Sequence, residues 1–331
     1  MLYSGHNRIK DKMKRKVIRQ GNGTLTVTLP KNWTKDIGLK GGDEVEVQEV
    51  ERGILFSTDF HSKQKSISIN IDHMERLSLA KVLIACFEQG FDSITLTFSK
   101  SKIKSWSHGN ENLPDLVKFF VGRLIGFEVL SQTSASITIG NLSEKLTKFE
   151  NILSRIFFLI EEYLQHLIES MKSGDYSDLK NSENRHDNIT KLVALGLRMV
   201  SEDTTHSRAD ALNYFTILNY LDKITDFIRY AYKNTSSFGK KVSKETLNAA
   251  EKSFKYLETY RHFFYKFDYK AVNELDEMRG EIKNLIVKAS RKGANADINS
   301  QLDGMVESLH GIVKSRIAIE LSQANFKKTA V

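Results

Sequence analysis

The chain has 331 residues, of which 40% are hydrophobic and 27% are charged, with one cysteine and two prolines. This composition supports a folded core and excludes a largely disordered chain. The single cysteine, Cys86, excludes an intramolecular disulfide and a CxxC zinc site, and it fits a reducing cytoplasm. No apolar run approaches the length of about 20 residues that spans a bilayer. We therefore expect a soluble, cytoplasmic protein of two or three domains with no segment inserted in a membrane.

The positive charge is concentrated at the start of the chain. Residues 1–40 contain ten Lys or Arg and two Asp, and this surplus of eight equals the net charge of the whole chain. The basic and acidic residues of the remaining chain are equal in number. A basic end on a neutral body is typical of polyanion binding, although the block from Arg8 to Lys12 also fits a solvated tail.

Residues 14–60 have the pattern of short strands joined by tight turns. Strands are expected over 16–20, 24–29, 44–50 and 54–56, with polar and apolar residues alternating along the second and third. An Asn22-Gly23 step marks the first turn, and Pro30 ends the second strand and opens a short helix over 31–37. A domain this small buries little apolar surface by itself, so we expect it to form a dimer.

Residues 66–140 predict a mixed α/β domain. We expect strands over 66–71, 92–98, 127–130 and 136–139, helices over 75–89 and 114–125, and a polar loop over 99–112. Asp72 has the spacing of a helix N-cap, with Glu75 three residues later. Cys86 lies on the apolar side of the first helix and is expected to be buried rather than nucleophilic.

The rest of the chain predicts long helices over 143–172, 184–201, 206–234, 243–267, 270–291 and 298–326. In the third helix, apolar residues recur at alternating spacings of three and four from Tyr214 to Ala231, which is typical of a bundle core. Six such helices predict two three-helix bundles in tandem. The expected fold class is therefore α+β, with domains over 12–60, 66–140 and 143–326.

The N-terminal region resembles an AbrB/MazE/SpoVT domain. The resemblance rests on two stretches, Lys16-Val-Ile-Arg-Gln-Gly-Asn-Gly-Thr-Leu-Thr-Val-Thr-Leu-Pro-Lys31 and Gly38-Leu-Lys-Gly-Gly-Asp-Glu-Val45. It implies a swapped-hairpin β-barrel that exists as an intertwined homodimer and binds DNA. We expect the DNA contacts to come from the basic residues of this region, namely Lys14, Arg15, Lys16, Arg19, Lys31 and Lys35.

The helical region resembles the PhoU family. The phrase Leu221-Asp-Lys-Ile-Thr-Asp226 matches the Leu-Glu-Arg-Ile-x-Asp signature of that family, and the order of the three regions is similar to archaeal PhoU-type phosphate uptake regulators. The resemblance implies divalent metal (Mg, Mn or Fe) at Asp222 and Asp226. The equivalent acids of the second repeat are replaced by His310 and Lys314.

The two aspartates also have a simpler interpretation. Asp222 and Asp226 lie four residues apart and opposite the apolar seam of their helix, so we expect them to face away from the core. Arg229 lies three residues after Asp226 and is placed to neutralise it. On this interpretation the pair belongs to a solvated or ion-paired surface rather than to a metal site.

Three classes of function remain open. No catalytic motif is present, so we expect a regulator and not an enzyme. The first hypothesis is a DNA-binding transcriptional regulator linked to phosphate uptake, with a helical body that senses or relays. The second is an adaptor that docks a phosphate transporter ATPase, a kinase or a sensor, with the barrel used only for dimerisation. The third is an antitoxin-like protein that neutralises a partner.

Overall fold

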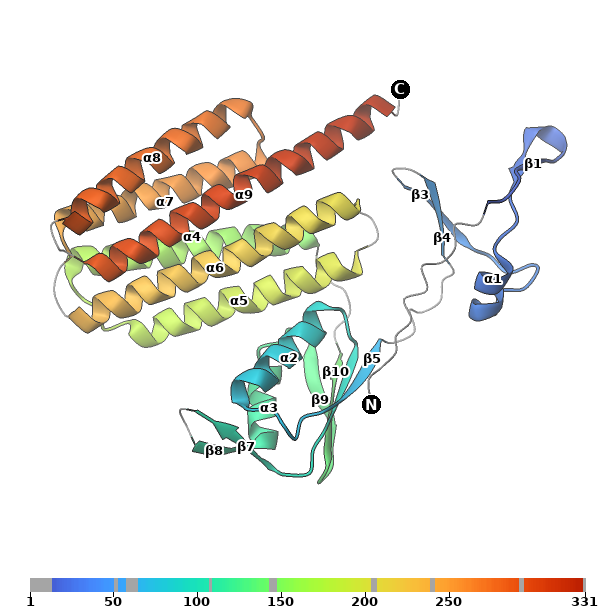
Figure 1. Ribbon diagram of the computed structural model, residues 1–331, viewed down its shortest axis with the longest axis horizontal. Helices are drawn as coiled ribbons and strands as arrows, with labels where there is room; N and C mark the ends of the chain where they lie inside the picture. The colour runs from blue at the N-terminus through green and yellow to red at the C-terminus, as the bar shows by residue number, and fades with distance from the viewer. Residues whose placement is uncertain are drawn as a thin grey trace. The chain divides into compact units, whose positions relative to one another are not determined.

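The computed structural model describes residues 14–50, 53–57, 65–106, 109–142, 148–203, 207–238, 242–291 and 295–329. The chain divides into two compact units, Met1–Phe60 and His61–Val331, each of which is described by itself (Figure 1). The domain boundaries expected at residues 12, 60 and 143 lie outside the described residues. The division into three domains stays a prediction. Within the second unit, the name α/β domain is used for residues 65–142 and the name bundle for the helices over 148–329.

The first unit is built from two hairpins and one helix. Strand β1 (Ile18–Arg19) pairs antiparallel with β2 (Leu25–Thr26) across a 3-10 turn, η1 (Gly21–Gly23). Helix α1 (Lys31–Ile37) follows, and strand β3 (Glu46–Val50) then pairs antiparallel with β4 (Gly53–Ser57). These elements confirm the expected hairpin turn and short helix. The first two strands are shorter than expected, because in a single chain the residues that flank them are not paired with a further strand.

Helix α1 ends in a Schellman motif. The Gly38 amide donates to the Lys35 carbonyl at 3.2 Å, and the Leu39 amide donates to the Thr34 carbonyl at 2.9 Å. Gly38 has a φ of 74°, a left-handed conformation that favours glycine. The Gly-Leu-Lys sequence after α1 is therefore the stop signal of this helix.

The apolar side chains of the first unit lack a core within one chain. Val17, Leu25 and Ile54 have exposed fractions of 63%, 65% and 59%, and no described residue of this unit is buried. The sheets described here are separate two-stranded pairs, so a closed barrel is not formed by one chain. Exposed strand residues of this kind are covered in a stable protein by a partner surface.

The second unit begins with a four-stranded mixed sheet of order β5-β6-β10-β9. Strand β5 (Ser66–Asn70) runs parallel to β6 (Ser93–Thr97), and helix α2 (Arg76–Glu88) makes the crossover between them. Strand β10 (Ser136–Asn141) pairs antiparallel with both β6 and β9 (Phe127–Gln132). Helix α2 and helix α3 (Leu113–Val121) cover one face of this sheet (Figure 1). Cys86 is buried in that core, as expected.

Three expectations for this domain are wrong in detail. Asp72 does not cap α2, because its carboxylate accepts the Ser99 amide and hydroxyl from the segment after β6 instead. The segment predicted as a loop contains a hairpin, with β7 (Lys102–Ser105) antiparallel to β8 (Gly109–Asn112). Helix α3 ends at Val121 rather than near 125, since Gly122 follows and the next amides form turn bonds to residues three positions earlier.

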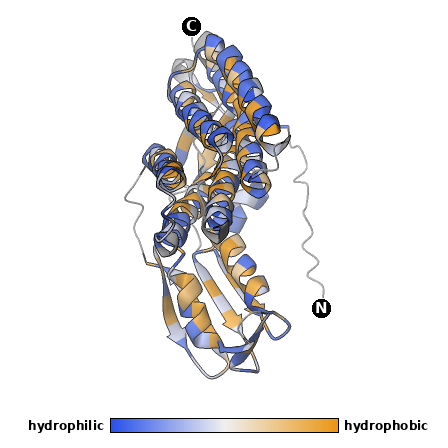
Figure 2. Cartoon of the chain, turned by 90° about the vertical axis from the view of Figure 1, so that its left-hand side faces the viewer, coloured by the Kyte–Doolittle hydropathy of each residue, from blue (hydrophilic) through white to orange (hydrophobic). Residues whose placement is uncertain are grey.

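Six long helices form the remaining part of the described chain, and all six were expected. They are α4 (Phe149–Ser173), α5 (Leu179–Glu202), α6 (Arg208–Phe238), α7 (Lys244–Tyr265), α8 (Tyr269–Arg291) and α9 (Ala296–Thr329). Helices α6 and α9 pack along each other and join the α4–α6 half to the α7–α9 half. The helices carry both apolar and polar residues around their circumference (Figure 2), and the apolar ones form one continuous core. Among the helices described, none has both the length and the hydropathy that a bilayer-spanning helix needs.

A buried arginine joins the α/β domain to the bundle. Arg198 of α5 is 4% exposed, and its guanidinium donates to the carbonyls of Phe87 and Phe91 at 3.1 and 2.7 Å. The same group pairs with Asp92 at 2.9 Å and with Glu202 at 2.8 Å. Phe91 and Asp92 lie just after α2, and Phe87 lies in its last turn, so one side chain fixes the end of α2 against α5.

We expect the full chain to be a dimer through the first unit. Light scattering is expected to give twice the chain mass of 37.8 kDa at micromolar concentration. Leu25→Glu places a charge on the exposed apolar strand surface and is expected to shift the protein to a monomer. The control Leu321→Glu alters a half-exposed leucine of α9 and is expected to leave the mass unchanged. A monomeric wild-type chain would contradict the prediction.

We expect Arg198→Met to lower the free energy of unfolding by about 3–5 kcal/mol, because it leaves two carboxylates and two carbonyls without their buried donor. Urea unfolding at fixed protein concentration measures this change. The control is Arg155→Met, since Arg155 is exposed and surface substitutions usually change stability by under about 0.5 kcal/mol. A loss below 1 kcal/mol for Arg198→Met would show that the junction does not depend on this residue.

Candidate functional site

The six basic residues expected to bind DNA lie on the surface of the first unit. Lys14, Arg15 and Lys16 form an extended segment that leads into β1, and Arg19 is in that strand. Lys31 and Lys35 lie one turn apart on α1 and therefore point to the same side of the helix. All six side chains are exposed, and none is in an ion pair with a residue that the structure describes. Such cations are available to an external polyanion.

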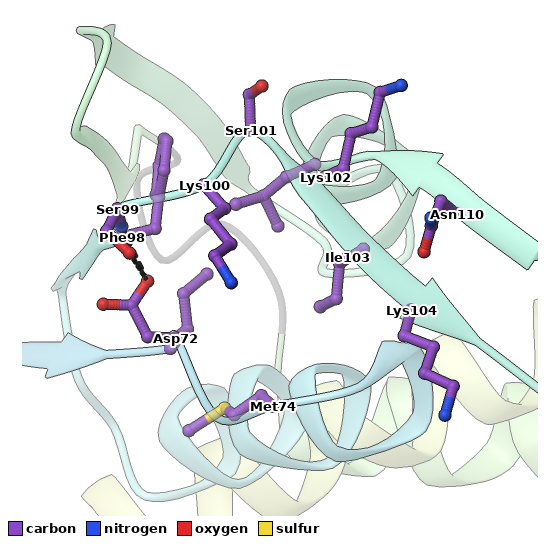
Figure 3. A pocket seen from close by; sticks show the side chains of 12 residues that line it. Asp72, Met74, Phe98, Ser99, Lys100, Ser101, Lys102, Ile103, Lys104 and Asn110 are labelled. Atoms are coloured by element: carbon purple, nitrogen blue, oxygen red, sulfur yellow. Dashed lines mark hydrogen bonds between the residues drawn. The ribbon is translucent and has the colours of Figure 1, made fainter.

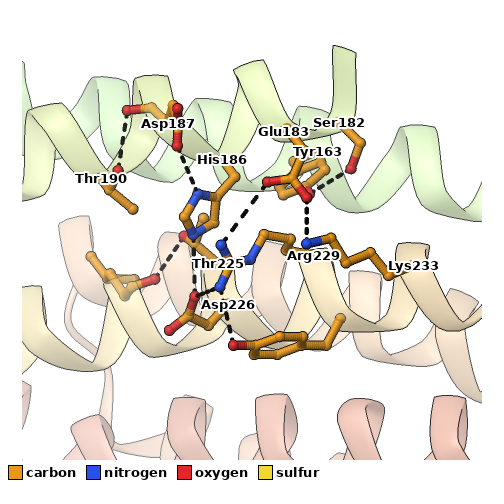
Figure 4. A network of polar contacts seen from close by, with 12 residues as sticks. Tyr163, Ser182, Glu183, His186, Asp187, Thr190, Thr225, Asp226, Arg229 and Lys233 are labelled. Atoms are coloured by element: carbon orange, nitrogen blue, oxygen red, sulfur yellow. Dashed lines mark hydrogen bonds and ion pairs between the residues drawn. The ribbon is translucent and has the colours of Figure 1, made fainter. Parts of the chain in front are cut away.

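A polar network centred on His186 lies between α5 and α6 (Figure 4). The Nδ1 atom of His186 is 3.2 Å from the Asp187 carboxylate, and its Nε2 atom is 3.2 Å from the Asp226 carboxylate. Arg229 donates to Asp226 at 2.9 Å, and Arg123 of the α/β domain donates to Asp187 at 2.5 Å. The network thus connects the α/β domain through α5 to α6.

The surroundings of His186 favour the charged form of its imidazole. Burial lowers the pKa of His186, but the hydrogen bonds to Asp187 and Asp226 outweigh it, and the pKa rises above its usual value of 6.5. The pKa values of Asp187 and Asp226 fall below normal despite burial, because His186 and an arginine donate to each carboxylate. Both ring nitrogens donate at once only in the protonated imidazole.

A cavity of about 240 Å³ lies beside this network. Its lining includes Glu88 from α2, Arg123 and Leu124 from the segment after α3, and Asp222 and Asp226 from α6. Burial raises the pKa of Asp222, and Asp226 adds to this by repulsion. Burial first and Asp222 second raise the pKa of Glu88 to about 7. Two carboxyl groups from different domains therefore share one partly dry space.

Asp222 and Asp226 lie opposite the apolar seam of α6, as expected, but this side of the helix faces α5 and a cavity rather than open solvent. Leu218, on the same side of α6, is fully buried, and a Cβ atom added to Gly196 of α5 would lie only 3.1 Å from it. Helix α6 is central, since it packs on α4, α5 and α9, and the side opposite its seam faces α5 rather than solvent. The expected neutralising contact between Arg229 and Asp226 is present.

The second half of the bundle carries an ion-pair cluster on its surface. Glu307 of α9 accepts two hydrogen bonds from Arg279 of α8, at 2.9 and 2.8 Å, and one from Lys283 at 2.7 Å. These bonds lower the pKa of Glu307 to about 2. The acid is thus neutralised by two cations.

The metal site at Asp222 and Asp226 stays a prediction. One Asp226 oxygen already accepts from His186 and Arg229, while Asp222 faces the cavity. In the part of the chain that the structure describes, no three His, Cys, Asp or Glu side chains are placed to hold one ion together.

The sequence pattern did not identify Glu88, Arg123, His186 or Arg198. Only the His186-Asp187 dipeptide, with Asp226 on a later helix, offered a local indication of a charged imidazole. The others acquire their roles from contacts between the two domains, which no spacing rule encodes.

We expect Glu88→Gln to remove a pH dependence of stability. The folded-state pKa of Glu88 is about 7 and its ordinary value is 4.5, so the folded chain retains this proton to a higher pH. The stability from protonated Glu88 is therefore complete below pH 4.5 and is lost as the pH rises to 7. At pH 8, Glu88→Gln is expected to be more stable than wild type by about 1 kcal/mol after solvent screening.

Urea unfolding between pH 4.5 and 8 measures this effect. The control is Glu274→Gln, because Glu274 is an exposed glutamate of α8 and its replacement is expected to leave the pH profile unchanged. Parallel profiles for wild type and Glu88→Gln would contradict the prediction.

Comparison with known proteins gives one match in sequence and one in structure. Residues 18–55 match the family described as antidote-toxin recognition MazE, a bacterial antitoxin. No curated protein matches the chain. A solved structure described as a PhoU-like phosphate regulatory protein, from Shewanella oneidensis MR-1, is 11% identical and is covered completely by 53% of this chain, with a TM-score of 0.39. That score is too low to establish a shared fold. The sequence match shows that the N-terminal unit is a MazE/AbrB-like domain.

Proposed function

We propose that this protein is a DNA-binding transcriptional regulator linked to phosphate uptake. In this proposal the first unit binds DNA as a homodimer, and the helical body senses a signal or relays it. The observation that carries the proposal is the coincidence, in one MazE/AbrB-like unit, of exposed apolar strands and exposed cations that form no ion pair with a described residue. The apolar strands supply a dimer surface and the cations supply phosphate contacts. We assign the protein no catalytic activity.

The link to phosphate rests on the signature-like phrase from Leu221 to Asp226. Leu221 and Ile224 of this phrase are fully buried in the bundle core. Asp222 and Asp226 face the cavity and the His186 network at the junction with the α/β domain. In this proposal a signal that changes the surroundings of Asp222 and Asp226 also changes the contacts between the α/β domain and the bundle.

A second candidate function follows from the family match itself. The matched family is described by recognition of a toxin, so exposed strand residues such as Val47 and Ile54 are also suited to bind a partner protein. The adaptor hypothesis differs from both, because it requires the first unit only for dimerisation. DNA binding by the first unit distinguishes the regulator from these alternatives.

We expect Lys16→Ala/Arg19→Ala to weaken DNA binding on every sequence tested. Each phosphate contact contributes about 0.9 to the slope of log affinity against log salt, so a dimer with two contacts fewer per chain loses up to about 4 from this slope. Fluorescence anisotropy with a labelled duplex at several salt concentrations measures both effects. The control is Lys244→Ala/Lys270→Ala, which removes the same charge from exposed positions of α7 and α8.

Genome-wide crosslinking of the protein to DNA, with and without phosphate starvation, measures which DNA sites it occupies in cells. Occupied DNA sites that change with phosphate, and that disappear in Lys16→Ala/Arg19→Ala, are the expected outcome. Unchanged DNA binding by that variant would contradict the assigned surface. A wild-type protein without DNA binding at low salt would favour the adaptor or the partner-binding function.

A further inference from the structure

A pocket of about 620 Å³ lies in the α/β domain, away from the His186 network (Figure 3). Its walls come from the residues after β5, from the segment between β6 and β7, from β7 and β8, and from the start of α3. It lies at the carboxyl ends of the parallel strands β5 and β6, where Ile71 and Phe98 are the first residues beyond each strand. Ligands of α/β sheets bind preferentially at this edge.

Three lysines border the pocket within five residues of sequence. They are Lys100, Lys102 and Lys104, all of them exposed. Along β7 the buried Ile103 alternates with the exposed Lys102 and Lys104. None of the three has an ion pair or a side-chain hydrogen bond with any residue placed by the structure. Like charges this close together repel one another, and a bound anion would reduce that repulsion.

The acid that borders the pocket does not neutralise these lysines. One oxygen of Asp72 accepts the Ser99 amide at 2.6 Å and the Ser99 hydroxyl at 2.9 Å, and the other accepts the Asn70 amide group at 3.3 Å. The bonds from Ser99 lower the pKa of Asp72. Asp72 thus braces the segment that carries Lys100 against the end of β5, and the lysines keep their net positive charge.

The floor of the pocket is apolar. Ile71, Phe98, Ile103 and Leu113 contribute to it, and each is at most 5% exposed. The volume lies within the range of about 300–1,000 Å³ typical of small-molecule sites. Inorganic phosphate would reach the lysines but would fill only a small part of this volume. A ligand that contacts the lysines and fills the pocket has an anionic end and a larger organic body.

We propose that this pocket binds an organic di- or triphosphate of nucleotide size. Its phosphates lie against Lys100, Lys102 and Lys104, and its organic body lies on the apolar floor. A single phosphomonoester carries about −1.5 to −2 charges at neutral pH, so three ammonium groups are better matched by two or more phosphates. This site does not depend on DNA binding by the first unit.

Calorimetric titration of the full chain tests the proposal, in low salt without DNA or divalent metal. The probes are ADP, which has both parts, pyrophosphate, which has the anion alone, and adenosine, which has the body alone. We expect ADP to bind at least tenfold more tightly than either part. Lys100→Gln/Lys104→Gln is expected to weaken ADP binding at least tenfold, since hydrogen bonds to charged groups are lost. The control Lys81→Gln/Lys118→Gln removes the same charge from α2 and α3 and is expected to change affinity less than twofold.

Protection from lysine acetylation provides a site-specific measurement on the unmodified chain. Bound ADP is expected to slow acetylation of Lys100, Lys102 and Lys104 but not of Lys81 and Lys118. Three results would each overturn the proposal. They are failure of ADP and pyrophosphate to bind at millimolar concentration, ADP binding unchanged by the double substitution, and binding of a thymidine oligonucleotide without binding of ADP. None of these results affects the test of DNA binding by the first unit.

Discussion

The junction between the α/β domain and the bundle depends on the hydrogen bonds and ion pairs of one buried positive charge, the guanidinium of Arg198. The guanidinium of Arg198 has two carbonyl and two carboxylate partners, and it also lies over the rings of Phe87 and Phe127 at 5.3 and 5.2 Å. A buried charge is costly unless it is paired and hydrogen-bonded, so the acceptors around Arg198 must be held in place. This requirement fixes the end of α2, the turn before β6 and the last turns of α5 together. The α/β domain and the bundle are therefore joined through a specific set of hydrogen bonds and not through apolar contact alone.

The same junction explains why the charged residues of α5 and α6 are where they are. Once α2 is fixed against α5, Glu88 is brought beside Asp222 across the cavity. Two carboxyl groups in a partly dry space disfavour ionisation, and the raised pKa of Glu88 expresses that cost. One turn further along α6, Asp226 lies next to a charged imidazole and a guanidinium and remains ionised. The contrast between two aspartates of one helix comes from neighbours on other elements.

Local pattern was sufficient for much of the fold. The repeat from Tyr214 to Ala231 identified α6 because a bundle core needs apolar residues at just that spacing, and Ile217, Leu221, Ile224 and Ile228 are all buried. The turn at Gly21–Gly23 and the end of α1 at Gly38 were likewise predictable, since glycine supplies the conformations they need. The β7–β8 hairpin was not predictable in this way, because Gly109, Asn110 and Asn112 have low strand propensity and form a strand only by pairing with β7.

The candidate site residues also divide into those that local sequence predicts and those that it does not. The six cations of the first unit were found from composition, because a surplus of charge is visible without a fold. Asp222 and Asp226 were found from a motif, but the cavity that they face was not predicted, since a helical wheel for one helix does not show the helices packed around it. Arg198 and His186 were missed because their partners are remote in sequence and, for Arg198, include backbone carbonyls that any residue could supply.

Helix α2 connects the pocket bordered by the three lysines to the cavity lined by Glu88 and Asp222. Asp72 and Met74, just before α2, line the pocket, while Glu88, its last residue, lines the cavity. Protein interiors are close-packed and transmit displacement rather than absorb it. A ligand that moves Lys100 toward the start of α2 would therefore shift α2 as a whole. The other end of this helix contacts Arg198 and lies beside Asp222. The net charge of the α/β domain and the helical body does not show this arrangement, because it adds three cations at one end of α2 to two carboxyl groups at the other without regard to their positions.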